Sequence, residues 1–595
     1  MFTTKTVGNG IGLSNSKFNN FPRQIIESTQ SGNATPFLQS QGTTQGAFFD
    51  SDTMKPLVNN PAFAKALLAP MIFSLRQRLH SWRKLFKYLP VMLTALWISI
   101  AVSGCSLFQS NPLTPSSPGL TQTTSQTSPA QRFDAVKINV VTNPGGLHLK
   151  AGTHIAEFEA LTGAKIELKE VPFINFRKLL EKNWSGNASE YDLAIILPQW
   201  QIDFADAGYI EDLTGRRKSD PALEWDDIAP LFRDFSANYK GRTYAIPLDG
   251  DFHMVYYRRD LLKQAGLKPP ETWDNYLAVA KQFHGKDLNG DGEPDYGSCI
   301  AKVAKEISTT FSISFFASFL QSQGTAQGMF FDPETMKPLV NNSGFGRALE
   351  LYKQTVKYGV PDDKNLNLAT ARKIFLSGRC AMTVDWGDIG PLAIDQAVSK
   401  VTDKVGASIT PGTTQVLDRR TNKLVACDKF TCPYAIDGVN HAPYAANGGW
   451  VGVVAAKSSP KVKDAAYAFL SYMSRPAQSN IDVTLGETGV NPYRISQFKN
   501  SDPWIKSGMS FEAANSYLGA IGVSLNSSNM VLDLKIPRSQ QYIETLDAIR
   551  ADFLVDKITK EEAMQQIEQR WEQITNKVGR KSQRAAYRAS LGLTQ

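Results

Sequence analysis

The sequence predicts an α/β fold built as two lobes, and three observations support this expectation. The chain has 595 residues, which is more than one hydrophobic core usually accommodates. Its composition is that of a globular protein, with 42% hydrophobic and 20% charged residues. From Val136 onward, short apolar strands alternate with amphipathic helices, as they do in proteins with a largely parallel sheet.

The expected elements follow one another closely at the start of this region. Residues 136–141 and 164–171 have the pattern of strands, and residues 191–197 form a short apolar run typical of a buried strand. Between the first two strands, residues 153–162 have the periodicity of a helix. Residues 540–578 are predicted to be strongly helical.

The net charge of +8 is concentrated in the first 104 residues. This segment has ten Lys and Arg against three Asp and Glu, whereas the chain from Cys105 onward has 54 against 53. The body is therefore almost neutral, and no basic stripe interleaved with aromatic residues runs along it. This pattern excludes nucleic acid as a partner.

Residues 71–104 have the layout of a secretory signal peptide. Met71 opens a cationic start, and residues 89–102 form an apolar run shorter than the roughly 20 residues of a membrane span. The string Val102-Ser103-Gly104-Cys105 resembles the lipobox of bacterial lipoproteins, in which the cysteine thiol takes a diacylglycerol. The alternative is an uncleaved anchor with an incidental cysteine. Either way, the body is expected outside the cytoplasmic membrane. The cationic residues are Arg76, Arg78, Arg83, Lys84 and Lys87.

The stretch that follows Cys105 is rich in Ser, Thr, Pro and Gln and has few apolar residues to bury. This composition predicts a flexible linker. Residues 105–132 are therefore expected to tether the body to the membrane surface through a lipid on Cys105.

A fragment of the body is duplicated ahead of the signal region. Residues 37–67 match residues 319–349 without a gap, and 23 of the 31 positions are identical. The first copy lacks the strands that flank the second, so it has no core of its own to bury. We interpret residues 1–70 as a remnant of a related gene or as the product of a start codon assigned too early, with Met71 as the true start. A regulatory decoy copy is the alternative, and no contribution to activity is expected from this segment.

Several strings of the body resemble the extracellular solute-binding proteins of ABC importers, in the sugar-binding group that includes maltose-binding protein. The resemblance extends from about residue 136 to about residue 578. One string departs from the family pattern, because Arg258 replaces the usual asparagine. In chain order, the strings are FEALTG at 158–163, YDL at 191–193, AGYIEDL at 207–213, YYRRDLL at 256–262, AGL at 265–267, PETW at 270–273, FLSGRCAM at 375–382 and GGWVGV at 448–453.

The resemblance implies a type II periplasmic-binding-protein fold, in which two α/β lobes are joined by a hinge with the ligand cleft between them. Closing the hinge buries a carbohydrate against both lobes, and the permease subunits of the importer distinguish the closed form from the open one. The chain is expected to act as a monomer. Crossings between the lobes are expected near residues 245–251 and 450–455. The expected parts are 133–248 with 455–500 for the first lobe, 249–454 with 501–578 for the second, and 579–595 as a tail.

Three tryptophans stand in loops where the family positions aromatic rings against its ligand; two of them follow strands, and the third opens the second crossing. These are Trp200, Trp386 and Trp450, and the glycine pair that ends at Gly449 would let the backbone approach the ligand. An indole ring suits the apolar C–H face of a sugar. The alternative for each tryptophan is a structural position in the core.

Carboxylates at the first crossing are candidates for hydrogen bonds to sugar hydroxyls. Asp249 and Asp251 are separated by one residue, so both face the same side of an extended chain. The alternative is a pair of solvated carboxylates in a turn. Asp203 and Asp385 are weaker ligand candidates, and His253 is weaker still, because a lone histidine on a strand usually packs in the core.

Residues 287–295 resemble the first part of a calcium-binding loop. Asp287, Asn289, Asp291 and Asp295 occupy positions one, three, five and nine, and a glycine stands at position six. Position twelve is Ser298 instead of a bidentate glutamate, so the pattern is incomplete. We expect either a structural calcium ion here or a polar turn, and no cofactor is required for function.

Four cysteines remain when Cys105 carries a lipid, and an even number outside the cytoplasm suggests two disulfides. Cys427 and Cys432 are close enough in sequence to clamp one loop, which leaves Cys299 with Cys380. Their spacing matches no zinc-binding pattern.

Two other functions are compatible with parts of the sequence. A lipid-anchored enzyme acting on glycans would use paired carboxylates, but the six histidines form no recognisable triad, and no P-loop, nucleophile elbow or zincin motif is present. No catalytic residue is therefore assigned. The same fold could also serve as a sensor or bind a polyamine, an iron chelate or a phosphate ester, and the sequence does not name the solute.

Overall fold

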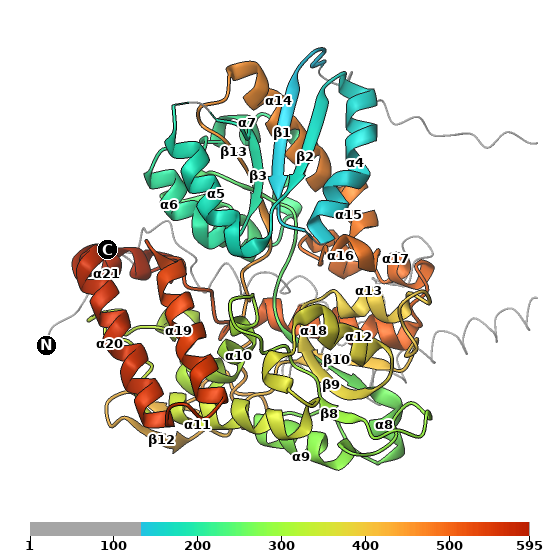
Figure 1. Ribbon diagram of the computed structural model, residues 1–595, viewed down its shortest axis with the longest axis vertical. Helices are drawn as coiled ribbons and strands as arrows, with labels where there is room; N and C mark the ends of the chain where they lie inside the picture. The colour runs from blue at the N-terminus through green and yellow to red at the C-terminus, as the bar shows by residue number, and fades with distance from the viewer. Residues whose placement is uncertain (1–131, 145, 188, 594–595) are drawn as a thin grey trace, which may run out of the picture.

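The computed structural model describes residues 132–144, 146–187 and 189–593, which form two lobes joined at a narrow waist (Figure 1). Each lobe has a β-sheet covered by helices, so the expected α/β class is confirmed. The upstream copy, the signal region, Cys105 and the linker as far as residue 131 lie outside the described residues. The expectations for these segments stay predictions.

The sheet of the first lobe has the strand order β2-β1-β3-β13-β6. Here β1 (Lys137–Thr142) pairs in parallel with β2 (Lys165–Glu170) and β3 (Leu193–Ile196), as the alternation of strands and helices predicts. The strands β13 (Val451–Val454) and β6 (Ile246–Pro247) complete the sheet in antiparallel pairing. All four residues of β3 are buried, which explains its continuous apolar sequence.

Helices cover both faces of this sheet. Ile138 and Val140 of β1 belong to one hydrophobic cluster with Phe158 of α4, whereas Val141 belongs to another with Phe176 of α5. This division follows from the alternation of side chains along a strand. The helices of the first lobe are α4 (Gly146–Thr162), α5 (Phe173–Ser185), α6 (Gln201–Asp206), α7 (Thr214–Lys218), α14 (Pro460–Ser474) and α15 (Pro476–Asp482).

The sheet of the second lobe has the order β10-β7-β9-β8 and is mixed, so the expectation of a largely parallel sheet is wrong for this lobe. Here β7 (Met254–Arg258) is antiparallel to both β10 (Val405–Ile409) and β9 (Cys380–Asp385), and only β8 (Tyr296–Ser298) and β9 are parallel. Because β7 enters directly from the other lobe, no βαβ crossover constrains its direction.

The helices of the second lobe surround α10, whose twelve residues are all buried. Its sequence has only apolar residues and small hydroxyl residues, which suits a helix at the centre of a large core. These helices are α8 (Arg259–Gln264), α9 (Trp273–Phe283), α10 (Thr309–Leu320), α11 (Ser343–Gln354), α12 (Leu368–Leu376), α13 (Ile389–Ile394), α17 (Asp502–Lys506), α18 (Phe511–Asn526), α19 (Ser539–Leu554), α20 (Lys560–Val578) and α21 (Arg580–Ser590). Smaller elements are α16 (Ile495–Lys499) and the strand pairs β4 (Asn238–Tyr239) with β5 (Arg242–Thr243) and β11 (Gln415–Asp418) with β12 (Lys423–Ala426).

The C-terminal helices pack on the body copy of the duplicated fragment. Trp571 of α20 lies 5.1 Å from Phe331, measured between ring centroids, and Tyr587 of α21 lies 5.6 Å from the same ring. The segment expected as a tail therefore contains a helix anchored by a buried tyrosine. Residues 319–349 are an integral part of the second-lobe core.

Two crossing segments pass each other at the waist with their backbones in direct contact. Residues 248–253 connect β6 to β7, and residues 445–450 lead into β13. Residues 451–454 thus belong to the first sheet, not to the second lobe as expected, and the second crossing precedes the expected 450–455. Gly449 has φ +80°, and a Cβ added there would lie 2.1 Å from the carbonyl oxygen of Asp249. A Cβ on Gly250 would lie 2.3 Å from the carbonyl oxygen of Pro492.

Both expected disulfides are present. Cys299–Cys380 joins the segment after β8 to the start of β9, and Cys427–Cys432 closes the short loop after β12. Within the described ranges, no helix is both long and apolar enough to cross a membrane.

Replacing Gly449 by alanine should destabilise the protein by about 2–5 kcal/mol. About 1–2 kcal/mol comes from the positive φ, and about 1–3 kcal/mol comes from overpacking against the first crossing. Gly438 is the matched control, because it has φ +79° but open space around its Cα. Gly438→Ala should lose only about 1–2 kcal/mol. Chemical denaturation of both variants measures the difference, and equal losses would contradict the close packing of the crossings.

Candidate functional site at the lobe junction

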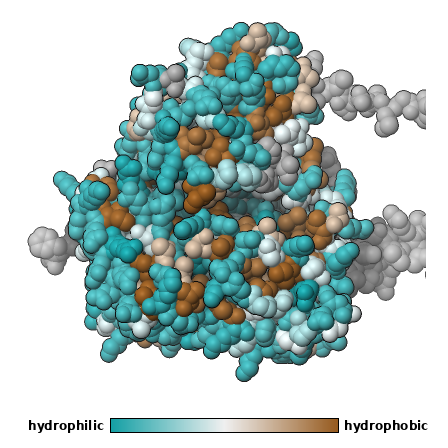
Figure 2. Space-filling model, viewed as in Figure 1, coloured by the Kyte–Doolittle hydropathy of each residue, from teal (hydrophilic) through white to brown (hydrophobic). Residues whose placement is uncertain are grey.

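The two lobes touch through side chains on either side of the waist, where the molecular surface is drawn in (Figure 2). In the first lobe, the short helix η2 (Pro198–Trp200) follows β3. Gln199 of this helix donates a hydrogen bond from Nε2 to the carboxylate of Asp533 in the second lobe. Trp200 donates from Nε1 to Oε1 of Gln540 at 3.1 Å. The short helix that follows β3 therefore contacts both the segment that leads into α19 and the first turn of α19.

Polar groups at this junction are buried. Asp533 accepts a 2.8 Å hydrogen bond from the hydroxyl of Tyr444, and burial raises the pKa of its carboxyl. Gln199 also approaches Oδ1 of Asn447 at 3.4 Å. Among the described residues, Oε1 of Gln199 and Nδ2 of Asn447 have no hydrogen-bond partner. Because a buried unpaired polar atom costs about 1–3 kcal/mol, these atoms are suited to bind a polar guest.

An aromatic group lies beside them in the second lobe. The ring of His253 stacks on Phe311 at 4.6 Å and meets the edge of Trp386 at 4.7 Å. His253 contacts Oγ of Ser314 through Nδ1, and its Nε2 has no partner in the described part of the chain. Burial lowers the pKa of His253 well below its usual value, so the imidazole is neutral. Trp386 donates from Nε1 to the carbonyl oxygen of Ala446, next to Asn447.

The other two predicted tryptophans share one neighbour in the first lobe. Phe173 lies 5.8 Å from Trp200 and 6.4 Å from Trp450, between ring centroids. Trp200 is 1% exposed, and the Arg177 guanidinium lies 5.8 Å from its ring. Trp450 is half-buried and so keeps part of its surface for a ligand. The structure thus places Trp200 and Trp450 together on one lobe and Trp386 on the other.

The predicted carboxylates at the first crossing are buried. Both accept hydrogen bonds from Asn491: Asp249 from its backbone N–H at 2.7 Å, and Asp251 from its Nδ2 at 2.9 Å. Asp249 also accepts from the backbone N–H of Trp450 at 3.4 Å. The two carboxyls therefore face one side, as their spacing predicts, but they face protein groups there. Their ligand roles stay predictions.

The weaker candidates are bound by arginines. Asp203 accepts from Arg177 at 2.5 Å and from the backbone N–H of Arg538 at 3.1 Å. Asp385 accepts hydrogen bonds from Nε and from one terminal nitrogen of Arg372, at distances of 2.7–3.2 Å. These ion pairs engage the two carboxylates in this conformation, and the ligand roles of Asp203 and Asp385 stay predictions.

The architecture and the junction chemistry agree with the results of sequence comparison. A family model described as bacterial extracellular solute-binding protein matches residues 153–503, which is more than half of the chain. The chain belongs to this family. Its body is accordingly extracytoplasmic, as expected for a protein that binds solutes outside the cell membrane.

Curated relatives of this solute-binding protein include sugar and sugar-alcohol binders. The mannitol-binding protein of Pseudomonas aeruginosa is 29% identical over 238 residues, which cover 40% of this chain and 51% of the relative. The multiple sugar-binding protein of Streptococcus mutans is 29% identical over 100 residues, covering 16% of this chain and 21% of the relative. The match to the mannitol-binding protein thus spans about half of its length.

Solved structures with the same fold include two-lobed receptors. A solute-binding protein from Agrobacterium radiobacter K84 in complex with ribitol has a TM-score of 0.60 and 22% identity, covering 75% of this chain and 100% of that one. MalE3 of T. maritima with bound maltose has a TM-score of 0.58 and 21% identity, covering 74% and 100%. These likenesses establish the fold.

The predicted calcium loop of this solute-binding protein is held by protein contacts. The carboxylate of Asp287 accepts backbone N–H groups of the loop, among them that of Asp291 at 3.2 Å. Asp295 is paired with Arg379 at 2.7 Å, and Asn289 donates to Asp291. Among the described residues, no three His, Cys, Asp or Glu side chains are grouped to hold a metal ion. In this conformation the loop is held as a polar turn, and a calcium ion bound to it stays a prediction.

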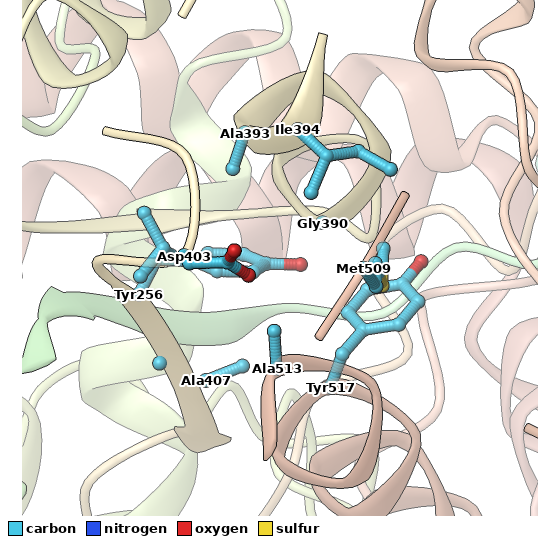
Figure 3. Close-up of a pocket in the computed structure, with 11 residues that line it drawn as sticks. Tyr256, Gly390, Ala393, Ile394, Asp403, Ala407, Met509, Ala513 and Tyr517 are labelled. Carbon is cyan, nitrogen blue, oxygen red and sulfur yellow. The ribbon is translucent and has the colours of Figure 1, made fainter. Parts of the chain in front are cut away.

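A small cavity lies away from the junction, in the second lobe. Tyr256 of β7 and Tyr517 of α18 stand on two sides of it (Figure 3). It has a volume of about 20 Å³, and neither tyrosine hydroxyl has a partner within the described ranges. This space suits one water molecule, not a solute.

The solute-binding protein also has a buried lysine between its lobes. Lys535 reaches from the segment before α19 to the first lobe, where it donates to the carbonyl oxygens of Phe235, Ser236 and Asn238. Burial lowers the pKa of Lys535 to about 7. The amine is therefore close to its titration point at neutral pH.

The sequence did not single out Gln199, Tyr444, Asn447 or Asp533. Two of them could have been found from their neighbours in the sequence, because Gln199 precedes Trp200 and Asn447 precedes the glycine pair of the second crossing. Nothing local pointed to Asp533, which is 334 residues from Gln199.

Lys535 should make the stability of the protein rise with pH. Its pKa is lower in the folded state than in the unfolded state, so the unfolded chain binds more protons between about pH 7 and about pH 10. The free energy of unfolding should increase by up to about 4 kcal/mol over this range. Lys535→Gln should flatten the increase, whereas Lys268→Gln on the surface should not. Denaturation curves across this range test the effect, and parallel curves for Lys535→Gln and the unchanged protein would contradict it.

Proposed function

We propose that this protein captures an uncharged carbohydrate or sugar alcohol between its lobes and delivers it to the permease of an ABC importer. The observation that carries the proposal is the set of buried, unpaired hydrogen-bonding atoms on Gln199, Asn447 and His253 beside the aromatic rings of the junction. The names of the mannitol-binding and multiple sugar-binding relatives support this class of solute.

The chemistry of these groups suits a polyhydroxylated guest. A hydroxyl group both donates and accepts a hydrogen bond. Oε1 of Gln199 can accept from it, and Nδ2 of Asn447 can donate to it. The neutral imidazole of His253 adds no charge. The half-buried indole of Trp450 offers an apolar face for the C–H groups of the guest. Hydrogen bonds to both lobes would favour the closed form.

A binder, not an enzyme, is the function that we propose. The family is defined by solute capture, and the buried aspartates of the crossing are engaged by Asn491. The same fold with a polyamine, an iron chelate or a phosphate ester is the alternative solute class. A glycan-active enzyme is the third reading. A binder should saturate and return its ligand chemically unchanged, which chromatography of the recovered solute tests.

Mannitol, ribitol and maltose should be screened by thermal shift and then by calorimetry. A ligand that binds only the folded state raises the melting temperature with its occupancy. Gln199→Ala and Trp450→Ala should each weaken binding by about tenfold to a hundredfold, since each loss is worth roughly 1–3 kcal/mol. Phe430→Ala is the control, because Phe430 is 75% exposed on the Cys427–Cys432 loop. Binding of a polyamine or a phosphate ester with no response to sugars would overturn the solute class.

We further propose that a lipid on Cys105 anchors the mature protein to the outer side of the cytoplasmic membrane. The lipobox-like string and the polar linker support this anchor. Cys105→Ser should move the protein from the membrane fraction to the soluble fraction without changing solute affinity. Mass spectrometry of the mature N-terminus is the direct measurement, and an unmodified Cys105 in the membrane-bound protein would refute the anchor.

A further inference from the structure

Four aspartates and one arginine form a cluster at the waist, beside the two crossing segments. Asp249 and Asp251 flank Gly250 in the first crossing, and Asp385 and Asp388 lie at the end of β9 and just beyond it. Arg372 of α12 contacts Asp385 at 2.7 Å and Asp388 at 3.0 Å. If every group were ionised, one guanidinium would face four carboxylates. The pair Asp249 and Asp251 is 1% and 5% exposed, so water offers little compensation.

The two carboxyls of the first crossing are held by the same residue. Asp249 accepts a hydrogen bond from the backbone N–H of Asn491 at 2.7 Å, and Asp251 accepts one from Nδ2 of Asn491 at 2.9 Å. Ionised carboxylates only accept hydrogen bonds and repel each other, so two buried neighbouring carboxyls are stabilised by a proton on one of them. Arg372 is engaged by the other two aspartates and does not supply the compensating charge.

The neighbouring elements hold this arrangement in place. Asn491 donates from Nδ2 to Asp251 at 2.9 Å and to Asp388 at 3.3 Å, and its backbone N–H donates to Asp249 at 2.7 Å. Asn491 therefore donates hydrogen bonds to three of the four carboxyls. The other titratable groups that face the cluster are Tyr256 of β7 and Tyr517 of α18, and burial raises the pKa of both hydroxyls. They remain neutral and add no charge.

We propose that Asp249 and Asp251 share one proton at neutral pH and that this proton stabilises the buried conformation of the first crossing segment at the hinge. Asp249 follows the last strand of the first lobe before the crossing, and Asp251 lies on the side that leads into β7. The proton thus sits at the point about which the lobes are joined. This inference concerns the ligand-free protein and goes beyond the proposed function.

The sign of the pH dependence of stability follows from the same contacts. Burial and the carboxylates of Asp249 and Asp388 hold the pKa of Asp251 well above its usual range. The folded state then binds a proton that the unfolded chain releases near pH 4. Its contribution to stability is present at low pH and is lost as the pH rises through the folded pKa. This slope is opposite in sign to that of Lys535.

Infrared spectroscopy of the full, ligand-free protein detects the proton directly. A protonated carboxylic acid has a carbonyl band that a carboxylate lacks. The difference spectrum between the unchanged protein and Asp251→Asn at neutral pH should show one such band, and the spectrum with Asp249→Asn should show the same loss. Asp192→Asn is the control, because Asp192 is a buried aspartate of the first lobe that accepts hydrogen bonds from Asn139 and Ser458. Absence of the band from both difference spectra would overturn the proposal.

Melting temperatures give a second, independent measurement. The melting temperature of Asp251→Asn minus that of the unchanged protein should increase from about pH 5 to about pH 9. The unchanged protein loses the stabilising proton over this range, whereas the amide of the variant cannot ionise. Asp249→Asn provides the same test where Asp251→Asn folds poorly. A pH-independent difference for both variants would contradict the shared proton. Neither measurement uses a solute, so failure here is separate from failure of the proposed sugar binding.

Discussion

Backbone packed directly against backbone at the waist is the constraint on which the rest of this structure depends. Gly449 and Gly250 leave no room for a side chain, so the two crossing segments and the Pro492 segment lie in contact. Each crossing carries residues of the candidate site within a few residues of these glycines. Asp249 and His253 belong to the first crossing, and Asn447 and Trp450 belong to the second. The close approach of the crossings therefore brings the residues of the candidate site together.

Burial at the junction has two opposite consequences. It removes water from Gln199, Asn447 and His253, which leaves hydrogen-bonding atoms available for a guest. It also places an amine and several carboxyls where their charged forms are disfavoured, as at Lys535 and Asp533. An uncharged, polyhydroxylated guest of the kind proposed suits such a junction, because its hydroxyl groups can pair with the unpaired atoms and need no counter-ion.

The departures from expectation have local causes. The strand β13 joins the first sheet because it runs antiparallel to β3 immediately after the crossing. The helix α21 forms because Tyr587 finds a buried position beside Phe331, which no pattern within residues 579–595 reveals. Arg379, far from the loop in sequence, pairs with Asp295, a contact that the loop sequence alone does not predict.

The sequence by itself determined the α/β class, the two-lobed family and the short disulfide loop, because these depend on local periodicity, contiguous strings and short spacing. The sequence also placed each tryptophan beside a strand, but the ligand roles of the tryptophans stay predictions, since Trp200 and Trp386 are buried in this conformation. Only the tertiary structure decided that Gln199 meets Asp533 across 334 residues and that Asn491 brackets the aspartates of the crossing. The physical reason is that such pairs share no local pattern. They are in contact only because the chain segments that join the two sheets pass each other closely at Gly250 and Gly449.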